Sequence, residues 1–271
     1  MSQVVDIFTA SLRSEDAVLV TVASTQGSVP RGPDAWMAVF TDTVVGTIGG
    51  GHLEFEAIAQ AQRRLAGADA ESVLRFPLGP SLGQCCGGVV QLRFERVTAA
   101  DGPALQERLA PRLAPLALFG GGHVGKALVN ALAPLPFAIR WIDSRDEIFP
   151  AQLPANVISE HSDPVHGAVA DLASGSRVLI MSFSHAEDLD VVAACLRRLR
   201  ERDDLPYIGL IGSDTKWATF RHRLEQRGFS PEELARITCP IGLPGIAGKQ
   251  PEVIAASVAA QILLLAPPDA S

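Results

Sequence analysis

The 271-residue sequence contains few cysteines and no apolar run long enough to span a membrane. Its four cysteines are two neighbours, Cys85 and Cys86, and two isolated residues, Cys195 and Cys239, which do not form a secreted disulfide framework. No C-x-x-C or H-x-x-x-H pair is present, so the usual metal-binding spacings are absent. The most apolar late segment, Val258–Pro267, is too short to cross a bilayer.

Basic residues are also in deficit. There are 23 lysines and arginines against 30 acidic residues, which gives a formal net charge of −7. This balance, with no basic run, predicts no nucleic-acid partner. The segment Met1–Arg13 lacks the pattern of a signal peptide, so we expect a cytoplasmic protein with no membrane partner. The hydrophobic content of 47% is that of a foldable globular chain with one large or two ordinary domains.

The first half of the sequence predicts an N-terminal α+β domain over residues 1–97. Apolar residues at helical spacing predict a first helix, and a second helix is expected from about Leu53 to Leu65. Segments rich in β-branched residues predict strands over 17–24, 36–40, 43–48, 72–76 and 89–96. Residues 98–115 shift to alanine, proline and charged residues, which predicts a linker with one short helix.

A glycine run precedes the second predicted helix. Gly49, Gly50, Gly51 and His52 occupy this helix start, where bare backbone N–H groups beside the positive end of the helix dipole predict an anion pocket. His52 is either a hydrogen-bonding residue at the helix start or a ligand-facing group of that pocket. Arg31, in a loop rich in proline and glycine, either holds an anion or is a solvated surface charge.

The segment Gly79–Gly88 reads GPSLGQCCGG and presents adjacent thiols between glycines. Glycine lets the backbone approach a ligand closely, and a disulfide between neighbouring cysteines would be strained. We therefore favour a thiol-bearing ligand site that contains Gln84, Cys85 and Cys86. Packing of the cysteines as small hydrophobic residues is the alternative.

The second half predicts a C-terminal Rossmann-like parallel-sheet domain over residues 116–271, so the fold class is α/β. Gly120, Gly122 and Gly125 fit G-x-G-x-x-G between a predicted strand over 116–119 and a predicted helix over 124–132. Asp143 ends the next predicted strand, where a dinucleotide-binding unit places a carboxylate for a ribose diol. These features together favour a Rossmann-like unit, and the fold by itself does not identify its ligand.

Other residues of this half allow two interpretations. Arg145 either faces a phosphate or forms an ion pair with a neighbouring carboxylate, and His123 either faces the ligand or packs against the next turn. Later strands are predicted over 177–183, 207–211 and 237–241, with helices after each strand and a final helix over 252–265. Cys195 lies on the inward face of one of these helices and is expected in the core.

Three stretches of the sequence resemble the XdhC–CoxI family. They are GTIGGGHLE at Gly46–Glu54, GPSLGQCCGG at Gly79–Gly88, and the glycine motif Gly120–Gly125 followed by WIDSR at Trp141–Arg145. The resemblance covers essentially the whole length and has the same two-domain order. One departure is Met181–His185, where a Thr-His-x-His-like stretch is expected and only His185 remains.

The resemblance implies a molybdenum cofactor chaperone rather than an enzyme. Such proteins bind the molybdopterin form of the cofactor while a cysteine desulfurase supplies its terminal sulfido ligand, and then deliver it to apo-xanthine dehydrogenase. Molybdenum cofactor biosynthesis proteins and a second copy of the chain are further candidate partners. The resemblance places Cys85 and Cys86 near the molybdenum or the incoming sulfur, and the Rossmann glycines with Arg145 at the phosphate or pterin.

Two alternatives stay open. An NAD(P)-dependent oxidoreductase would use the Rossmann domain with Asp143 on the ribose, but it leaves the paired cysteines and the GGGH loop without a role. A cysteine-based sulfur carrier without bound pterin would carry a persulfide on Cys85 or Cys86.

Overall fold

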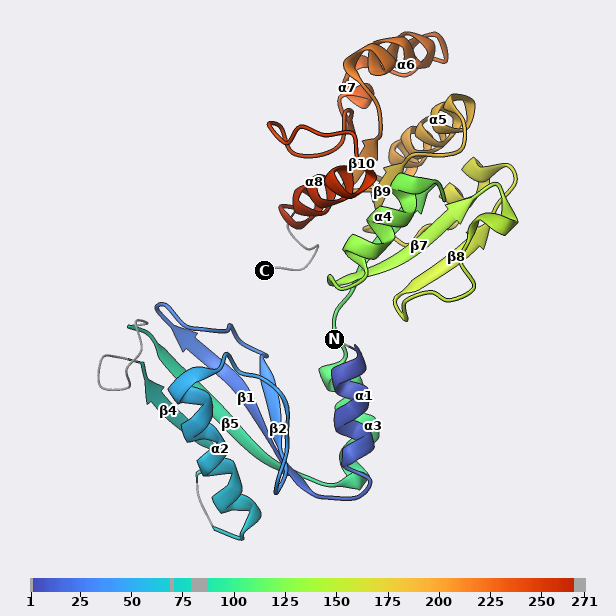
Figure 1. The fold of residues 1–271 in the computed structure, drawn as a ribbon. Helices are drawn as coiled ribbons and strands as arrows, with labels where there is room; N and C mark the ends of the chain where they lie inside the picture. Colours follow the sequence, from blue (N-terminus) through green and yellow to red (C-terminus); the bar gives the residue numbers. More distant parts are fainter. Residues whose placement is uncertain (1, 69–70, 79–86, 266–271) are drawn as a thin grey trace. The chain divides into compact units, whose positions relative to one another are not determined.

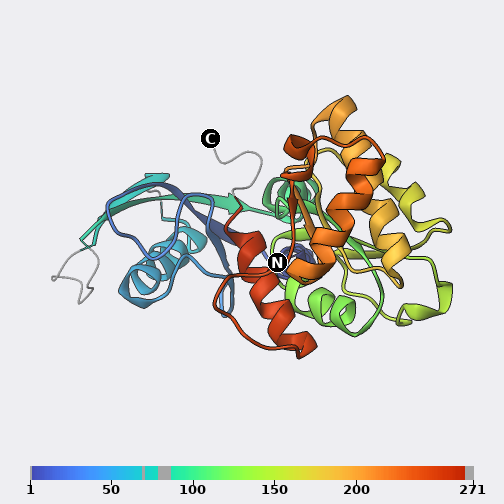
Figure 2. The ribbon, with the colours of Figure 1, turned by 90° about the horizontal axis from the view of Figure 1, so that it is seen from above.

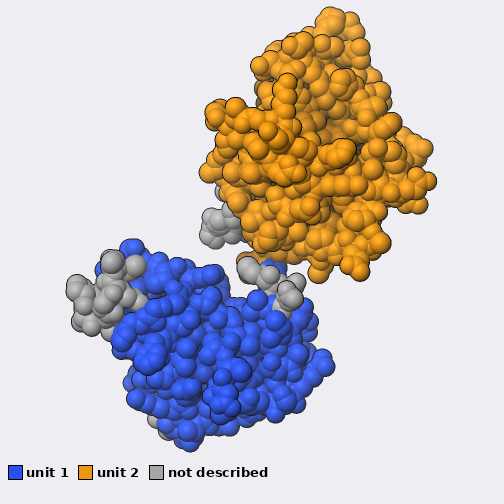
Figure 3. All heavy atoms as spheres, viewed as in Figure 1, with its two compact units in different colours: residues 1–111 blue, residues 112–271 orange. Residues whose placement is uncertain are grey.

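The computed structural model describes residues 2–68, 71–78 and 87–265. The chain forms two compact units, Met1–Pro111 and Arg112–Ser271 (Figure 3). Among the described residues, no helix is long and apolar enough to cross a membrane.

The first unit is a five-stranded antiparallel sheet in the order β3-β2-β1-β5-β4 (Figure 1). Its strands are β1 (Ala17–Gln26), β2 (Trp36–Val39), β3 (Val44–Gly46), β4 (Val73–Pro77) and β5 (Val89–Val97). Helix α2 (Gly51–Leu65) packs on one face, where Leu53 meets Val18 and Val20 of β1. Helix α1 (Ser2–Ser11) packs on the other face, where Phe8 meets Leu19. The predicted strands and helices of this half are confirmed, with ends that differ by about two residues.

The segment expected as a linker is part of the first unit up to Pro111. It contains the 3-10 helix η2 (Ala99–Asp101) and helix α3 (Gly102–Leu109). Leu105 of α3 is buried in the same core cluster as Phe8 and Leu12. Because this contact covers the second face of the sheet, the first unit extends past residue 97.

The second unit is a six-stranded parallel sheet in the order β11-β10-β9-β6-β7-β8. Its strands are β6 (Ala114–Phe119), β7 (Phe137–Asp143), β8 (Val157–His161), β9 (Arg177–Ile180), β10 (Tyr207–Leu210) and β11 (Ile237–Thr238). The chain winds outward from β6 to β8 and then returns to β9 on the other side of β6. This reversal defines a topological switch point at β6 and β9, and the predicted Rossmann-like fold is confirmed.

Helices cover both faces of this sheet. Helices α4 (His123–Leu132) and α8 (Pro251–Leu263) lie side by side on one face (Figures 1 and 2). The other face carries the 3-10 helix η4 (Val165–Asp171) and helices α5 (His185–Arg202), α6 (Asp214–Gln226) and α7 (Pro231–Leu234). Cys195 is fully buried among them as expected, and burial raises the pKa of its thiol to about 12.

Some elements differ from the sequence prediction. Strand β8, the 3-10 helix η3 (Asp146–Ile148), η4 and α7 were not predicted. The predicted strand over 177–183 ends early, because β9 stops at Ile180. Beyond it, the backbone N–H groups of Ser182 and Phe183 donate to the carboxylates of Asp188 and Glu187 on α5, at 2.7 and 3.0 Å, instead of to a neighbouring strand.

Arg198 of α5 forms a buried ion pair with Asp204 and also donates to backbone carbonyls at η4. The Arg198 guanidinium donates to the Asp204 carboxylate at 2.9 and 2.7 Å and to the carbonyls of Val169 and Leu172 at 2.7 Å each. The side chains of Arg198 and Asp204 are only 5% and 13% exposed. The Arg198 hydrogen bond holds the pKa of Asp204 below its ordinary value.

We expect Asp204→Ala to lower the free energy of unfolding of the second unit by about 3 kcal/mol, because it leaves the Arg198 charge buried without its counterion. Asp190→Ala is the matched control, since Asp190 and Arg227 form a pair that is 42% and 40% exposed and should cost below about 1 kcal/mol. Urea denaturation of the full chain measures both changes. Equal losses in the two variants would contradict the structural role of Arg198.

Candidate functional site

Three loops meet at one end of the sheet in the first unit. The antiparallel strand order brings three segments to this end: the loop after β1, the loop after β3, and the residues just before β5. A Cβ added at Gly88 would lie 2.4 Å from the carbonyl oxygen of Ser28, and one added at Gly49 would lie 2.5 Å from the Cβ of Pro30. The loops are therefore in contact. We call residues 26–35, 47–50 and 87–88 the loop cluster.

Leu78 and Gly88 flank the cysteine segment and form what we call its base, and Gly88 belongs to the loop cluster. Leu78 N donates to Gly88 O at 2.7 Å, which closes the two ends of the segment. Gln84, Cys85 and Cys86 lie outside the described residues, so their role as ligands stays a prediction. Arg31 of the loop cluster is exposed, and its Cγ would lie 3.3 Å from a Cβ at Gly49. The structure thus brings together Arg31, the glycine run and the base of the cysteine segment.

The glycine loop already has an internal acceptor. Glu54 Oε2 accepts hydrogen bonds from Ile48 N at 3.0 Å, Gly50 N at 3.1 Å and Thr47 Oγ1 at 2.5 Å. Thr47 Oγ1 in turn accepts from Gly49 N at 3.1 Å. The prediction of bare amides is therefore wrong at Gly49 and Gly50. The available signal was an acidic residue in the first turn of α2, directly after the glycines.

The remaining residues of the GGGH motif lie at the start of α2. Gly51 is the first residue of this helix, and a Cβ at Gly50 would meet nothing within 4 Å. His52 Nε2 lies 3.1 Å from Glu56 Oε1, and its ring stacks on Phe55. Both contacts of His52 are with α2 itself, while the open side of the loop is at Gly50.

A second candidate site lies at the carboxyl ends of β6, β7 and β9. Two motif glycines are required by packing, since a Cβ at Gly120 would lie 2.0 Å from Met181 O and one at Gly125 would lie 2.0 Å from Gly120 O. Gly122 precedes α4, and a Cβ there would meet nothing within 4 Å. His123 is exposed as the first residue of α4, so the ligand-facing interpretation remains for it. The motif thus combines two packing glycines with one open position.

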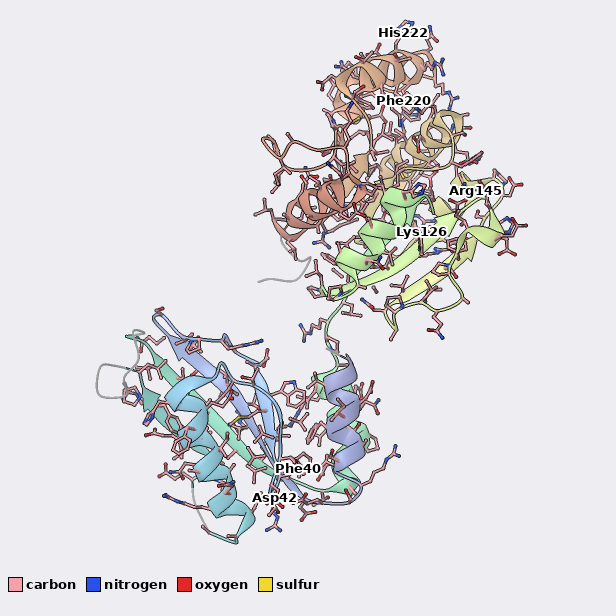
Figure 4. The ribbon with its side chains drawn as sticks, viewed as in Figure 1. Phe40, Asp42, Lys126, Arg145, Phe220 and His222 are labelled. Atoms are coloured by element: carbon pink, nitrogen blue, oxygen red, sulfur yellow. The ribbon has the colours of Figure 1, made fainter. Side chains whose placement is uncertain are left out.

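Asp143 lies where the motif predicts, at the end of β7, and is 1% exposed. Its Oδ2 accepts from Gly121 N at 2.6 Å and from Arg145 Nη2 at 2.9 Å, and its Oδ1 accepts from Arg145 N at 2.9 Å and Nε at 2.8 Å. Burial raises the pKa of Asp143, but the hydrogen bonds from Arg145 and Gly121 outweigh burial and lower it below its ordinary value. Of the two interpretations of Arg145, the structure shows the ion pair. Figure 4 marks the position of Arg145 in the second unit.

Phe183 is a site residue that the sequence analysis did not single out. The Arg145 guanidinium carbon lies 4.3 Å from the centroid of its ring, yet Phe183 remains 65% exposed. Glu187 joins Phe183 to the residue before Arg145, because it accepts from Ser144 Oγ at 2.8 Å and from Phe183 N at 3.0 Å. His185, the other residue of this stretch, packs edge-on against Phe220 of α6. The sequence signal was an aromatic residue at the end of the predicted strand over 177–183.

Metal binding by protein side chains finds no support in the described part of the chain. Within residues 2–68, 71–78 and 87–265, no group of three or more histidine, cysteine, aspartate or glutamate residues could hold a metal ion. This leaves the cysteine segment as the place where the sequence analysis expects a metal contact.

The two units and their glycine loops define a class of protein in which an α+β unit precedes a Rossmann unit. Residues 11–77 match the family model of the XdhC and CoxI family, and residues 116–262 match the model of the XdhC Rossmann domain. The two matches fall in different units, and the second covers more than half of the chain. The chain belongs to the XdhC family.

Two known proteins are similar over most of the chain. The uncharacterized protein YqeB of Escherichia coli (strain K12) is 28% identical over 278 residues, which cover 95% of this chain and 46% of YqeB. The chain therefore spans about half the length of this relative. A crystal structure described as a xanthine dehydrogenase from Bacillus halodurans is 20% identical, has a TM-score of 0.74 and covers 96% of this chain and 94% of that chain. This similarity supports the fold.

We expect Glu54→Ala to lower the free energy of unfolding by about 2 kcal/mol, because three donors of the glycine loop lose their acceptor. Amide hydrogen exchange at Ile48 and Gly50 should become faster. Glu56→Ala is the matched control on the same helix, since Glu56 forms an exposed i,i+4 pair with His52 and its loss should cost below about 0.5 kcal/mol. Unchanged exchange at both amides in Glu54→Ala would contradict the role of Glu54.

The Asp143 pair gives a pH dependence. A carboxylate whose pKa is lowered on folding contributes stability above its unfolded pKa, about 3.9, and loses that stability as the pH falls through the folded pKa. The stability difference between the wild type and Asp143→Asn should therefore be constant from pH 7 to about 5 and shrink in more acidic solution. Denaturation curves over pH 2–7 measure it. A difference that does not change with pH would show that the Asp143 charge is not involved.

Proposed function

We propose that this protein is a maturation factor for xanthine dehydrogenase. In this proposal it binds the molybdopterin form of the molybdenum cofactor, holds it while a cysteine desulfurase adds the terminal sulfur, and delivers it to the apo-enzyme in the cytoplasm. Membership of the XdhC family supports the proposal. The observation that carries it is that the loop holding Arg31 contacts two other parts of the cluster. It meets the glycine loop at Gly49 and the base of the cysteine segment at Gly88.

The chemistry of this end of the first unit suits the cargo. Thiolates are preferred ligands of soft metal centres, so we assign Cys85 and Cys86 to the molybdenum or to the incoming sulfur, with Gln84 beside them. Arg31 is an exposed cation in the loop cluster, and a guanidinium binds phosphate through two donors. Glu54 already accepts hydrogen bonds from the amides of the glycine loop, so the positive charge for a phosphate would come from Arg31. The open space at Gly50 would let the phosphate approach the backbone closely.

A carrier differs from an enzyme in what it does with its cargo. The cofactor must leave the protein intact, so several moderate contacts serve better than a closed coordination site. We therefore propose transfer without turnover of a substrate. Molybdenum cofactor biosynthesis proteins on one side and the apo-dehydrogenase on the other are the partners that this role requires.

The NAD(P)-dependent oxidoreductase is the competing function. The open Gly122 at the start of α4 would accommodate a pyrophosphate. The ribose contact fits less well, because Asp143 is buried and already accepts four hydrogen bonds, three of them from Arg145. A ribose diol would have to displace Arg145 from both carboxylate oxygens. This observation favours the maturation factor.

The test is a titration of cofactor-free, full-length protein with the molybdenum cofactor, in parallel with NAD(H) and NADP(H). We expect stoichiometric cofactor binding that the double variant Cys85→Ser, Cys86→Ser loses. Cys239→Ser is the matched control, because it replaces a half-buried thiol of the second unit.

Two results would contradict the proposal. Tight nicotinamide binding without retention of the cofactor would favour the oxidoreductase. An added sulfur on Cys85 or Cys86 after incubation with a desulfurase, in protein that does not retain pterin, would favour a simple sulfur carrier.

A further inference from the structure

The ring of Phe183 is exposed at the switch point of the second sheet. Phe119 of β6 pairs with Ile180 of β9, so Gly122 and Phe183 follow neighbouring strands at equal distance from this pair. Ligands of open parallel α/β sheets bind in the crevice at these carboxyl ends. An aromatic side chain that is 65% exposed at this position is therefore placed to meet a ligand.

One face of the ring is covered and the other is open. The Arg145 guanidinium lies over one face, 4.3 Å from the centroid. Since a single guanidinium covers that face and most of the side chain remains exposed, the opposite face is free for a planar group. The covered face also has a favourable cation–π contact, which holds the ring against Arg145.

Hydrogen bonds fix both members of this stack before any ligand arrives. The Asp143 carboxylate holds Arg145 through its backbone N–H and two guanidinium nitrogens. The Glu187 carboxylate holds the backbone of Phe183 and also accepts from Ser144. Pre-organised groups lose little conformational entropy on binding, which favours affinity.

The residue next to Phe183 adds an independent observation. The hydroxyl of Ser182 is buried and has no hydrogen-bond partner among the described residues. A buried hydroxyl without a partner is destabilising, so its presence calls for an explanation, such as a bound water or ion or a functional role. This position is therefore unusual in the same short turn that presents the ring.

We propose that Phe183, supported by Arg145, is a stacking platform for the fused heteroaromatic ring of a pterin or a purine nucleotide. Both ring systems are planar and stack on aromatic side chains through their faces. When the ligand is a purine nucleotide, its phosphate would lie toward the open Gly122 at the N-terminus of α4. If the ring is a pterin, the inference rests on the proposed function. If it is a purine, it stands without that function.

The experiment measures equilibrium binding of pterin, GMP, AMP and inorganic phosphate to the full-length protein. We expect Phe183→Leu to weaken binding of the ring-containing probes about tenfold and to leave phosphate binding unchanged. Phe183→Trp should bind the ring-containing probes about as tightly as the wild type, because it keeps an aromatic face at this position. Ile158→Ala is the matched control, since Ile158 is 71% exposed on β8 of the same unit and has no aromatic ring.

Tighter binding of pterin than of nucleotides would assign the platform to the pterin, and the reverse order would assign it to a purine. Equal affinity of the wild type and Phe183→Leu for every ring-containing probe, or no binding of these probes at all, would overturn the proposal. Cofactor titration of the cysteine double variant is a separate measurement. If cofactor binding does not depend on Cys85 and Cys86 while the ring probes still require Phe183, the assigned role of the cysteines fails and the platform stands.

Discussion

The hydrogen-bonded pair of Asp143 and Arg145 organises the carboxyl end of the second sheet. Through Asp143 it holds the amide of Gly121, and so the glycine motif after β6. Through Arg145 it supports the ring of Phe183 after β9. The site on three neighbouring strands therefore depends on one buried carboxylate, whose charge is stable in the interior only because Arg145 and the backbone donate to it.

In the first unit, too, an internal carboxylate accepts hydrogen bonds from the backbone of a glycine loop. Its glycine loop has backbone donors that water or an acceptor must satisfy, and the Glu54 carboxylate supplies the acceptor from within the chain. In both units an internal carboxylate therefore occupies donors that sequence motifs assign to an external anion. Our proposals therefore place a ligand beside these carboxylates, at Gly50 and Arg31 in one unit and at Gly122 and Phe183 in the other.

Each unit offers an exposed group of a kind that binds ligands. Phe183 gives the second unit an aromatic face on which planar rings stack, and Arg31 gives the first unit a cation that binds phosphate. The second unit has the fold of a dinucleotide-binding domain, but the Asp143 carboxylate that would bind the ribose already accepts hydrogen bonds from Arg145 and Gly121.

The sequence by itself determined the two-unit order, most strands and helices, and the positions of the glycine loops. These features follow from local patterns: the β-branched residues of β1, the G-x-G-x-x-G spacing, and the helical periodicity of α5. Only the tertiary structure decided which donors are free. Glu54 and Asp143 are ordinary acidic residues in the sequence, and their saturation depends on backbone amides at Ile48, Gly50 and Gly121 that folding brings within hydrogen-bond distance. The exposure of Phe183 is likewise decided by the turn that Glu187 and Asp188 hold, a contact between side chains and backbone that no periodicity records.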